Sequence, residues 1–336
     1  MTQPPVVSIL TPNFNRAAFV AETLDSLLAQ DYPHWECLVV DDGSEDDSPA
    51  MVQAYAQRDG RIRFLRRDRP PKGACCCRNI GVEHSRGKYV MFLDTDDLLE
   101  PFCLAQRVAA MESRPELDFG IFPALLFRNR PHDLNLLWNI DTGEELLERQ
   151  FRQDAVCQGT GPLFTRAAFD RLGRWDEGLH LWQDIDLFLR AYIQDYRCAL
   201  FFDRPPDLHI RRFEGSLSRS SFFTPPKTAS RIRIVRRAVA LLKIHGKQHR
   251  LQEARFMLAE LILGAARMGR HALVGRLIRW GICQGCLDHA EGRLLSRLAL
   301  LYRWRLHRLP VVKRAMGRAQ APFICTTRMC LVPHRP

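Results

Sequence analysis

Tyr89-Val90-Met91-Phe92-Leu93-Asp94-Thr95-Asp96-Asp97 is the segment that says most about the fold of this chain. Its apolar first half is typical of a buried strand, and three carboxylates follow at the carboxyl end. In open α/β folds, the carboxyl ends of the strands face the crevice in which ligands bind. Crowded carboxylates repel one another unless a cation lies among them, and oxygen-only ligands suit Mg²⁺ or Mn²⁺. The alternative is an acidic turn that caps a helix beginning near Pro101.

Two segments upstream also end in polar residues. Residues 6–10 predict a first strand that runs into Thr-Pro-Asn-Phe-Asn-Arg at residues 11–16, and an amphipathic helix over residues 18–30 follows. Residues 35–40 predict a second strand that ends in Asp41-Asp42-Gly43-Ser44. Strands that alternate with helices predict a parallel sheet with its loops gathered along one edge. We therefore expect these polar residues to lie near the acidic loop.

Four motifs resemble, in their order and spacing, those of the family 2 glycosyltransferases. They are Thr-Pro-Asn-Phe-Asn-Arg at 11–16, Val-Val-Asp-Asp-Gly-Ser at 39–44, Arg-Asn-Ile-Gly at 78–81 and Phe-Leu-Asp-Thr-Asp-Asp at 92–97. Farther along, residues 161–177 look like the acceptor-side segment of this family. Trp-Gln-Asp-Ile-Asp-Leu at 182–187 looks like its Glu-Asp-Trp-Asp-Leu motif. The resemblance covers about residues 6–220.

This resemblance implies a fold and a reaction. The expected fold is α/β, a three-layer α/β/α nucleotide-sugar-binding domain of the GT-A type, followed by a mainly helical appendage. The implied reaction is an inverting, metal-dependent transfer of a sugar from a UDP- or TDP-type donor to an acceptor hydroxyl. The acceptor would be a carbohydrate or a lipid-linked molecule, in polysaccharide, lipopolysaccharide or glycolipid assembly.

The resemblance also assigns residues to the nucleotide pocket. Asp42 is expected to accept a hydrogen bond from the imide N–H of a uracil or thymine ring. Pro12, Asn15 and Arg16 are expected to form a wall of the same pocket. The alternative for Asp42 is an Asx-turn beside Gly43, and the alternative for Asn15 is a helix cap.

Further contacts to the sugar donor are expected from the opposite side and from the acidic loop. Lys72 and Arg78 flank Gly73 and would reach the nucleotide, although such residues are more often solvated surface charges. Asp94 would hydrogen-bond the ribose and Asp96 would ligate Mn²⁺ or Mg²⁺, with Asp97 in support. The bound cation would neutralise the departing diphosphate.

Asp184 falls where the family has its catalytic base. A base must approach the acceptor hydroxyl on the face opposite the leaving diphosphate, which produces inversion. The family usually has Glu at the preceding position, where this chain has Gln183. Loss of that neighbouring charge should push Asp184 less strongly toward protonation. The alternative is that Asp184 and Asp186 cap a helix over residues 187–193.

A second departure concerns residues 210–218. Phe213 stands where the family has a His that contacts the metal or the diphosphate. Either His209 substitutes for it, or Asp96, phosphates and water hold the metal alone. We favour the second interpretation, because four residues of extended chain span over about 12 Å. The residues expected to close over the diphosphate, or else to form an exposed basic loop, are Arg211, Arg212 and Ser218.

Charge is distributed unevenly along the chain. Residues 231–336 hold 22 Lys and Arg against 4 Asp and Glu, a net charge of +18, so residues 1–230 carry 11 − 18 = −7. This asymmetry predicts a catalytic domain over residues 1–222 and a basic helical region over 223–336. Thr224-Pro225-Pro226 is expected to break helical structure at the joint.

The basic region admits more than one interpretation. Its apolar residues recur at helical spacing, which suits either contact with an anionic membrane surface or a helical bundle. Trp280, Tyr302 and Trp304 among arginines also fit a nucleic-acid surface, but the acids of the strand ends would repel a polyanion. A nucleotidyltransferase would use clustered acids and a metal too, yet it needs an early glycine-rich loop, and residues 11–16 contain no glycine.

Cysteine usage and hydropathy indicate the compartment. No segment reaches the roughly 18 apolar residues of a membrane span, and the N-terminus lacks a secretion signal, so we expect a cytoplasmic protein that binds the inner membrane face at most peripherally. The 11 cysteines are odd in number and predict reduced thiols. Zinc binding by Cys283, Cys286, Cys325 and Cys330 is a weaker alternative to buried thiols in helix packing.

Overall fold

Two β-sheets form the framework of the protein. The computed structural model describes residues 4–212, 223–323, 328, 330 and 331. The larger sheet has the strand order β10-β6-β9-β4-β1-β2-β3. Its strands are β1 (Val7–Asn13), β2 (Trp35–Asp41), β3 (Ile62–Arg66), β4 (Tyr89–Phe92), β6 (Phe119–Ile121), β9 (Pro162–Thr165) and β10 (Cys198–Leu200).

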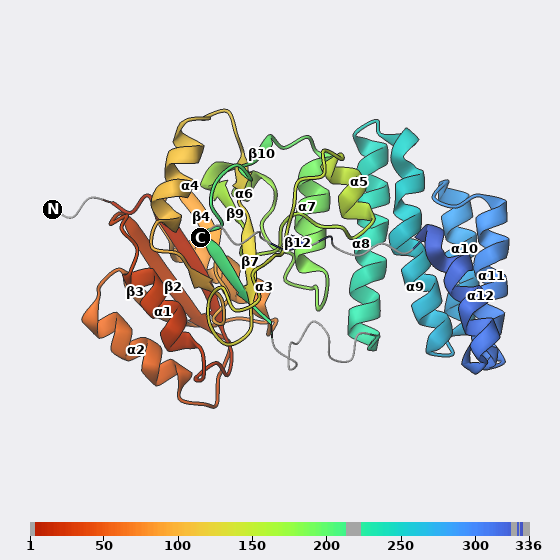
Figure 1. The fold of residues 1–336 in the computed structure, drawn as a ribbon, viewed down its shortest axis with the longest axis horizontal. Helices are drawn as coiled ribbons and strands as arrows, with labels where there is room; N and C mark the ends of the chain where they lie inside the picture. Colours follow the sequence, from red (N-terminus) through yellow and green to blue (C-terminus); the bar gives the residue numbers. More distant parts are fainter. Residues whose placement is uncertain (1–3, 213–222, 324–327, 329, 332–336) are drawn as a thin grey trace.

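Helices cover both faces of this sheet (Figure 1). Successive side chains of a strand point to opposite faces, so Val7 and Ile9 enter one hydrophobic core and Leu10 enters the other. The first core is shared with α1 (Val20–Leu28), α2 (Ser48–Arg58) and α4 (Cys103–Glu112). The second is shared with α3 (Ala74–His84), α5 (Leu146–Phe151), α6 (Arg166–Arg171) and α7 (Gln183–Ile193). The predicted three-layer α/β/α architecture is therefore confirmed.

The sheet is mixed, whereas the sequence pattern predicts a parallel one. Strands β3, β2, β1 and β4 run parallel, but β9 lies antiparallel to both β4 and β6. The prediction is wrong for this part because a strand buried on both faces has an apolar sequence in either direction.

A second sheet brings distant segments to the acidic loop. Its strand order is β12-β8-β7-β11-β5. Strand β11 pairs antiparallel with β5, which follows the acidic loop directly, and His209 lies opposite Leu98. The strands are β5 (Leu98–Leu99), β7 (Ala124–Phe127), β8 (Leu136–Leu137), β11 (Leu208–Arg211) and β12 (Cys330–Leu331).

The C-terminal region is helical, as predicted, and it lies to one side of the sheets (Figure 1). Helix α9 is its buried centre and packs against α8, α10 and α11. The helices are α8 (Pro225–Ile244), α9 (Arg255–Arg267), α10 (His271–Gln284), α11 (His289–Arg303) and α12 (Pro310–Gln320), with 3₁₀ turns at Gln248–Ala254, Leu306–Arg308 and Ala321–Phe323. None of the helices in the described ranges is long and apolar enough to cross a membrane.

The two regions pack against each other where they join. Thr224 is the N-cap of α8 and Pro225 occupies its first turn, where proline lacks no needed N–H, so these residues begin a helix instead of breaking one. Helix α8 packs against α7, and one hydrophobic core includes residues of both. The two parts therefore share a hydrophobic core. The division into 1–222 and 223–336 stays a proposal, and it describes a change from α/β to helical architecture.

Candidate active site

The polar ends of the first two strands are joined by hydrogen bonds. The side-chain amide of Asn13 donates to Asp41 Oδ1 and to Ser48 Oγ, both at 2.9 Å. The backbone N–H of Asp42 donates to the carbonyl of Asn13 at 2.8 Å. The carboxyl ends of β1 and β2 thus lie together, as the parallel pairing requires.

Asp42 is buried at this edge and has a partner that the sequence analysis missed. Arg67 Nε donates to Asp42 Oδ1 at 2.5 Å, and the N–H of Gly73 approaches the same oxygen at 3.3 Å. Arg67 directly follows β3. The signal that would have found it is the apolar strand Ile62–Arg66, whose carboxyl end must meet the ends of β1 and β2. Asp42 and Arg67 present a hydrogen-bond acceptor and a donor side by side.

The loop after β1 forms the rim of this region. Asn15 has a left-handed φ of 52° and accepts a hydrogen bond from the N–H of Glu45 at 2.8 Å, so it ties the two strand-end loops together. Pro12 is half-buried, and its carbonyl lies 3.5 Å from the Thr95 hydroxyl. Asn15 lies outside α1, whose N-cap is Phe19, so the capping alternative is wrong.

Lys72 and Arg16 each contact a neighbour of this rim. The Lys72 ammonium is 3.9 Å from the centre of the exposed Phe14 ring. Arg16 Nε lies 3.6 Å from Asp96 Oδ2, which links the first strand end to the acidic loop. A nucleotide base that entered between Lys72 and Asp42 would meet the charge of Lys72 and the ring of Phe14.

The acidic loop concentrates negative charge. Burial, followed by repulsion from Asp94, raises the pKa of Asp96 to about 6, while Arg16 and Arg211 oppose the shift. Burial and the two neighbouring carboxylates raise the pKa of Asp97 well above its usual value. Asp97 accepts a hydrogen bond from the N–H of Arg211 at 3.0 Å and therefore supports the loop. Such crowding favours a cation beside Asp94 and Asp96.

Arg78 connects the acidic loop to the predicted base. Its guanidinium is buried, donates to Asp94 Oδ1 at 2.6 Å and lies 4.9 Å from the ring centre of Trp175. Arg78 is therefore no solvated surface charge. The charges of Arg78 and Asp94 act on the Asp184 carboxyl in opposite directions: Arg78 lowers its pKa and Asp94 raises it. Trp175, which positions Arg78, was not assigned a role from the sequence.

Asp184 lies in the first turn of α7. Burial raises the pKa of its carboxyl, and the positive charge of Arg78 partly counteracts this. The N-cap of α7 is Trp182, in a left-handed conformation with φ of 61°, so neither Asp184 nor Asp186 caps the helix. The helix begins at Gln183, four residues before the predicted start.

Comparison with known proteins identifies the family. The family model "Glycosyl transferase family 2" matches residues 8–173, which include the strand ends and the acidic loop described above. Residues 8–173 therefore belong to glycosyl transferase family 2. Asp184 lies beyond the matched range, so its assignment stays a prediction.

Two curated relatives match part of the chain. The putative teichuronic acid biosynthesis glycosyltransferase TuaG of Bacillus subtilis is 36% identical over 110 residues, which are 33% of this chain and 43% of TuaG. The uncharacterized glycosyltransferase EpsJ of the same organism is 29% identical over 215 residues, 54% of this chain and 61% of EpsJ. The chain thus spans less than two thirds of these relatives.

A solved structure supports the fold over a greater length. Residues 1–349 of S. aureus TarS, in complex with UDP-GlcNAc, superpose with a TM-score of 0.60 at 17% identity, and the match covers 89% of this chain and 91% of that one. At 17% sequence identity, this structural similarity shows that the two proteins share a fold and nothing more. Its coverage extends beyond the family 2 region into the C-terminal helices.

The residues predicted to lie near the diphosphate, from His209 onward, are only partly described by the structure. The side chain of Arg211 is largely buried, and its guanidinium donates to the Asp96 carbonyl at 3.0 Å and to Glu22 at 2.5 Å, so here it braces the acidic loop. Arg212 bonds through its backbone N–H to the Phe127 carbonyl. His209 bonds to Glu100. Phe213 and Ser218 lie outside the described residues.

The cysteines do not form the alternative zinc site within the described part of the chain. Cys283 and Cys330 are exposed and Cys286 is buried, and these three form no group of potential metal ligands there. Cys325 lies outside the described residues. Every described cysteine is unpaired, as expected for reduced thiols.

Helix α8 supports the helix of the predicted base. The buried guanidinium of Arg231 lies 4.9 Å from the ring centre of Trp182 and 4.7 Å from that of Phe223. Burial lowers the pKa of Arg231 to about 10. The C-terminal region therefore contacts the first residues of α7 directly.

Proposed function

We propose that this protein transfers a sugar from a UDP- or TDP-type donor to an acceptor hydroxyl, with inversion at the anomeric carbon. Asp42 and Arg67 would bind the base, with Lys72 and Phe14 beside it, and Asp94 would hold the ribose. The observation that carries the proposal is the 2.6 Å contact of Arg78 with Asp94, because the charge of the same Arg78 also favours the ionised form of Asp184, the proposed base on α7.

The acidic loop fits a divalent cation. Asp96 is largely buried and repelled by Asp94, which raises its pKa to about 6, and a cation would relieve that repulsion. Carboxylate oxygens suit Mg²⁺ or Mn²⁺. Asp96 would hold the ion, which when bound neutralises charge on the diphosphate. Arg211 would keep the loop in place through the Asp96 carbonyl, and Arg16 would balance charge beside it.

Asp184 would take the proton of the acceptor hydroxyl. A raised pKa brings a carboxylate closer to the working pH, which improves a general base as long as it remains ionised. Arg78 favours the ionised form, and Gln183 adds no competing charge. The side of Asp184 that faces away from the diphosphate would then receive the acceptor, a carbohydrate or lipid-linked molecule of the cell envelope.

A panel of nucleotide sugars tests this function. The full-length protein is incubated with UDP-, TDP-, GDP- and CDP-sugars and Mn²⁺, and the released products are identified. We expect nucleoside diphosphate from a UDP- or TDP-sugar. Release of pyrophosphate from a nucleoside triphosphate and a sugar phosphate would indicate a nucleotidyltransferase instead. Binding to nucleic acid without any product would contradict the proposal.

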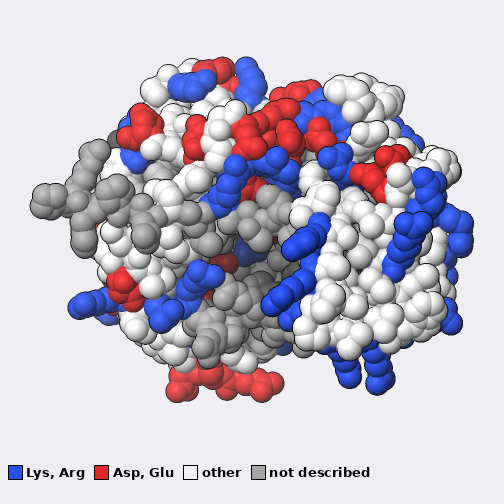
Figure 2. All heavy atoms as spheres, turned by 45° about the vertical axis from the view of Figure 1, so that its right-hand side comes forward, with Lys and Arg blue, Asp and Glu red and all other residues white. Residues whose placement is uncertain are grey.

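Membrane contact is a further part of the proposal. The junction of α11 and α12 exposes large apolar side chains, with Trp304 64% and Val311 79% exposed. Leu300 and Leu309 are exposed nearby, and Arg303, Arg305, Arg308, Lys313 and Arg314 flank them. Figure 2 shows basic side chains spread over the face formed by the C-terminal helices. Apolar anchors flanked by cations suit an anionic lipid surface. A cytoplasmic location at the inner face of a membrane remains the prediction.

A further inference from the structure

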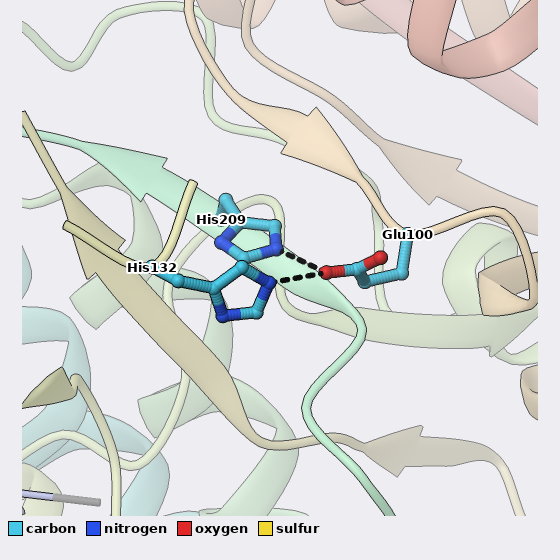
Figure 3. Close-up of side chains that lie close together, drawn as sticks. All are labelled: Glu100, His132 and His209. Carbon is cyan, nitrogen blue, oxygen red and sulfur yellow. Dashed lines mark hydrogen bonds and ion pairs between the residues drawn. The ribbon is translucent and has the colours of Figure 1, made fainter. Parts of the chain in front are cut away.

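Two histidines converge on one carboxylate, Glu100, which follows the acidic loop of the proposed donor site. His209 Nε2 lies 2.6 Å from Glu100 Oε1, and His132 Nε2 lies 3.1 Å from the same oxygen. One ligand atom of each residue lies within 4.8 Å of those of the other two. Figure 3 shows both rings pointing at Glu100 from different segments. Glu100 follows β5, His209 belongs to β11, and His132 comes from the loop between β7 and β8.

The loop that carries His132 has a defined shape. The carboxylate of Asp133 accepts hydrogen bonds from the backbone N–H groups of Arg128 and Asn129 at 2.9 and 2.8 Å. His132 itself adopts a left-handed φ of 66°, a backbone conformation that His adopts more readily than most other side chains. The Asp133 hydrogen bonds therefore hold a turn that presents the His132 ring toward Glu100.

We propose that Glu100, His132 and His209 bind a transition metal ion of the zinc class. Two imidazole nitrogens and one carboxylate oxygen form the ligand set of open zinc sites. Tetrahedral bonds of about 2.0–2.2 Å separate ligand atoms by about 3.3 Å, so the observed contacts need to lengthen by less than about 1 Å. His209 is 2% exposed and His132 is 61% exposed, which gives the site a fixed inner ligand and a side open to water.

This site differs in chemistry from the one proposed for the donor cation. Asp96 belongs to a group of carboxylates, which suit Mg²⁺ or Mn²⁺, whereas imidazole nitrogens suit Zn²⁺ or Co²⁺. The two sites are close along the chain, because Glu100 lies four residues after Asp96. His209 is also two residues from Arg211, which holds the acidic loop. An ion at His209 would therefore brace β5 and β11 beside that loop.

The surroundings of the His209 ring determine how tightly the metal ion should bind. A metal on Nε2 of His209 leaves the ring proton on Nδ1, which is buried and has no hydrogen-bond partner among the described residues. Metal-binding histidines usually donate that proton to a carboxylate or carbonyl, and loss of such a partner weakens binding by about 10–100-fold. We therefore expect an exchangeable ion and test the site by adding metal.

Titration of the metal-stripped full-length protein with Co²⁺ tests the proposal. The expected result is one Co²⁺ per chain with visible d–d absorption, no sulfur-to-cobalt charge transfer, and displacement by Zn²⁺. His132→Ala should weaken binding at least about 10-fold, because it removes a ligand. The control His249→Ala removes an exposed histidine in another part of the chain and should bind like the unaltered protein.

Three further measurements make the test decisive. Glu100→Gln should weaken Co²⁺ binding as His132→Ala does, and the unchanged melting temperature of metal-free His132→Ala should show that this exposed substitution leaves the fold intact. Asp96→Ala should retain the Co²⁺ spectrum, which separates this site from the donor cation. Absence of the d–d bands, or equal affinity of His132→Ala and His249→Ala, would overturn the proposal and leave a hydrogen-bonded cluster.

Discussion

Arg237 on α8 donates hydrogen bonds to both carboxylate oxygens of Asp186 on α7, at 2.8 and 2.9 Å. Asp186 is 1% exposed, lies two residues beyond Asp184, and also accepts a hydrogen bond from Arg190 at 2.9 Å. The same guanidinium of Arg237 reaches Asp176, which follows Trp175. The helix of the predicted base is thus held by a residue beyond the region that the family model matches.

Arg237→Gln should lower both stability and turnover. It leaves a buried carboxylate with one cation fewer, and because Arg237 is 26% exposed we expect a loss of about 1–3 kcal/mol, below the range for fully buried pairs. Displacement of α7 should lower kcat more than it raises KM for the nucleotide sugar. Arg236→Gln is the control, since Arg236 is exposed on the same helix. Equal urea midpoints and equal kcat for the two variants would contradict this role.

Asp184→Asn should abolish most of the transfer. The amide keeps the shape of the side chain but cannot accept the proton, so kcat should fall by about 100-fold or more while donor affinity barely changes. Because the pKa of Asp184 is raised, activity of the unaltered protein should decline as the pH falls and the base becomes protonated. Calorimetry with the nucleotide diphosphate measures affinity. Its collapse in the variant would make Asp184 a donor-site or structural residue.

Asp96→Ala should abolish turnover and weaken nucleotide binding in Mn²⁺. The reason is the loss of the ligand that would join the cation to the protein. Asp203→Ala, at an exposed carboxylate in another loop, is the matched control. Product release is measured with Mn²⁺ and with excess chelator. Full activity of Asp96→Ala, or of the unaltered protein in chelator, would rule out the metal role.

Asp96→Asn should stabilise the metal-free protein at neutral pH. The folded-state pKa of Asp96 is about 6, above the ordinary value of 3.8, so the folded protein binds the proton more tightly than the unfolded chain. The ionised carboxylate therefore destabilises the fold increasingly as the pH rises through this window. We expect a gain of about 1–3 kcal/mol at pH 7, which shrinks toward pH 4. Urea unfolding in chelator measures it, and a gain independent of pH would contradict the explanation.

Anionic vesicles should bind the full-length protein through the α11–α12 junction. Each Lys or Arg near such a surface contributes roughly 1 kcal/mol that salt screens, so co-sedimentation should weaken as salt rises. The double variant Trp304→Ala, Val311→Ser should bind more weakly, whereas the control Ile244→Ser, at an apolar residue that is 75% exposed on α8, should not. If the protein ignores vesicles and sediments as an oligomer, the junction is a subunit interface.

The chemistry of the strand ends could be predicted from the sequence because local pattern determines it. An apolar run followed by acids marks β4 and its loop, and Asp41 and Asp42 mark β2 in the same way. Parallel pairing then requires these ends to meet, so the amino-acid sequence alone assigns Asp42, Asp94 and Asp96 to one edge of the sheet. The helical nature of the C-terminal region follows from the spacing of its apolar residues.

The missed features depend on contacts between distant segments. The direction of β9 does not alter its apolar pattern, and Arg67 acquires meaning only through the pairing of β3 with β2. The bracing role of Arg211 was also missed, because it depends on the pairing of β11 with β5, which brings its guanidinium to the acidic loop; its predicted contact with the diphosphate stays a prediction. The pairing of β11 with β5 cannot be read from local periodicity, because it joins segments far apart in the chain, whereas the apolar strand before Arg67 was a signal that could have been used.

The C-terminal region contacts the catalytic region at several places, and two of these contacts join whole elements. Helix α8 packs on α7, and strand β12 returns to pair with β8, with Cys330 opposite Leu137. A chimaera that exchanged residues 223–336 with those of a relative would therefore place foreign side chains against Trp182 and Asp186. An active chimaera would need to carry α7 and β8 together with the C-terminal helices. We therefore expect the C-terminal region to be inherited together with Asp184, the proposed base on α7.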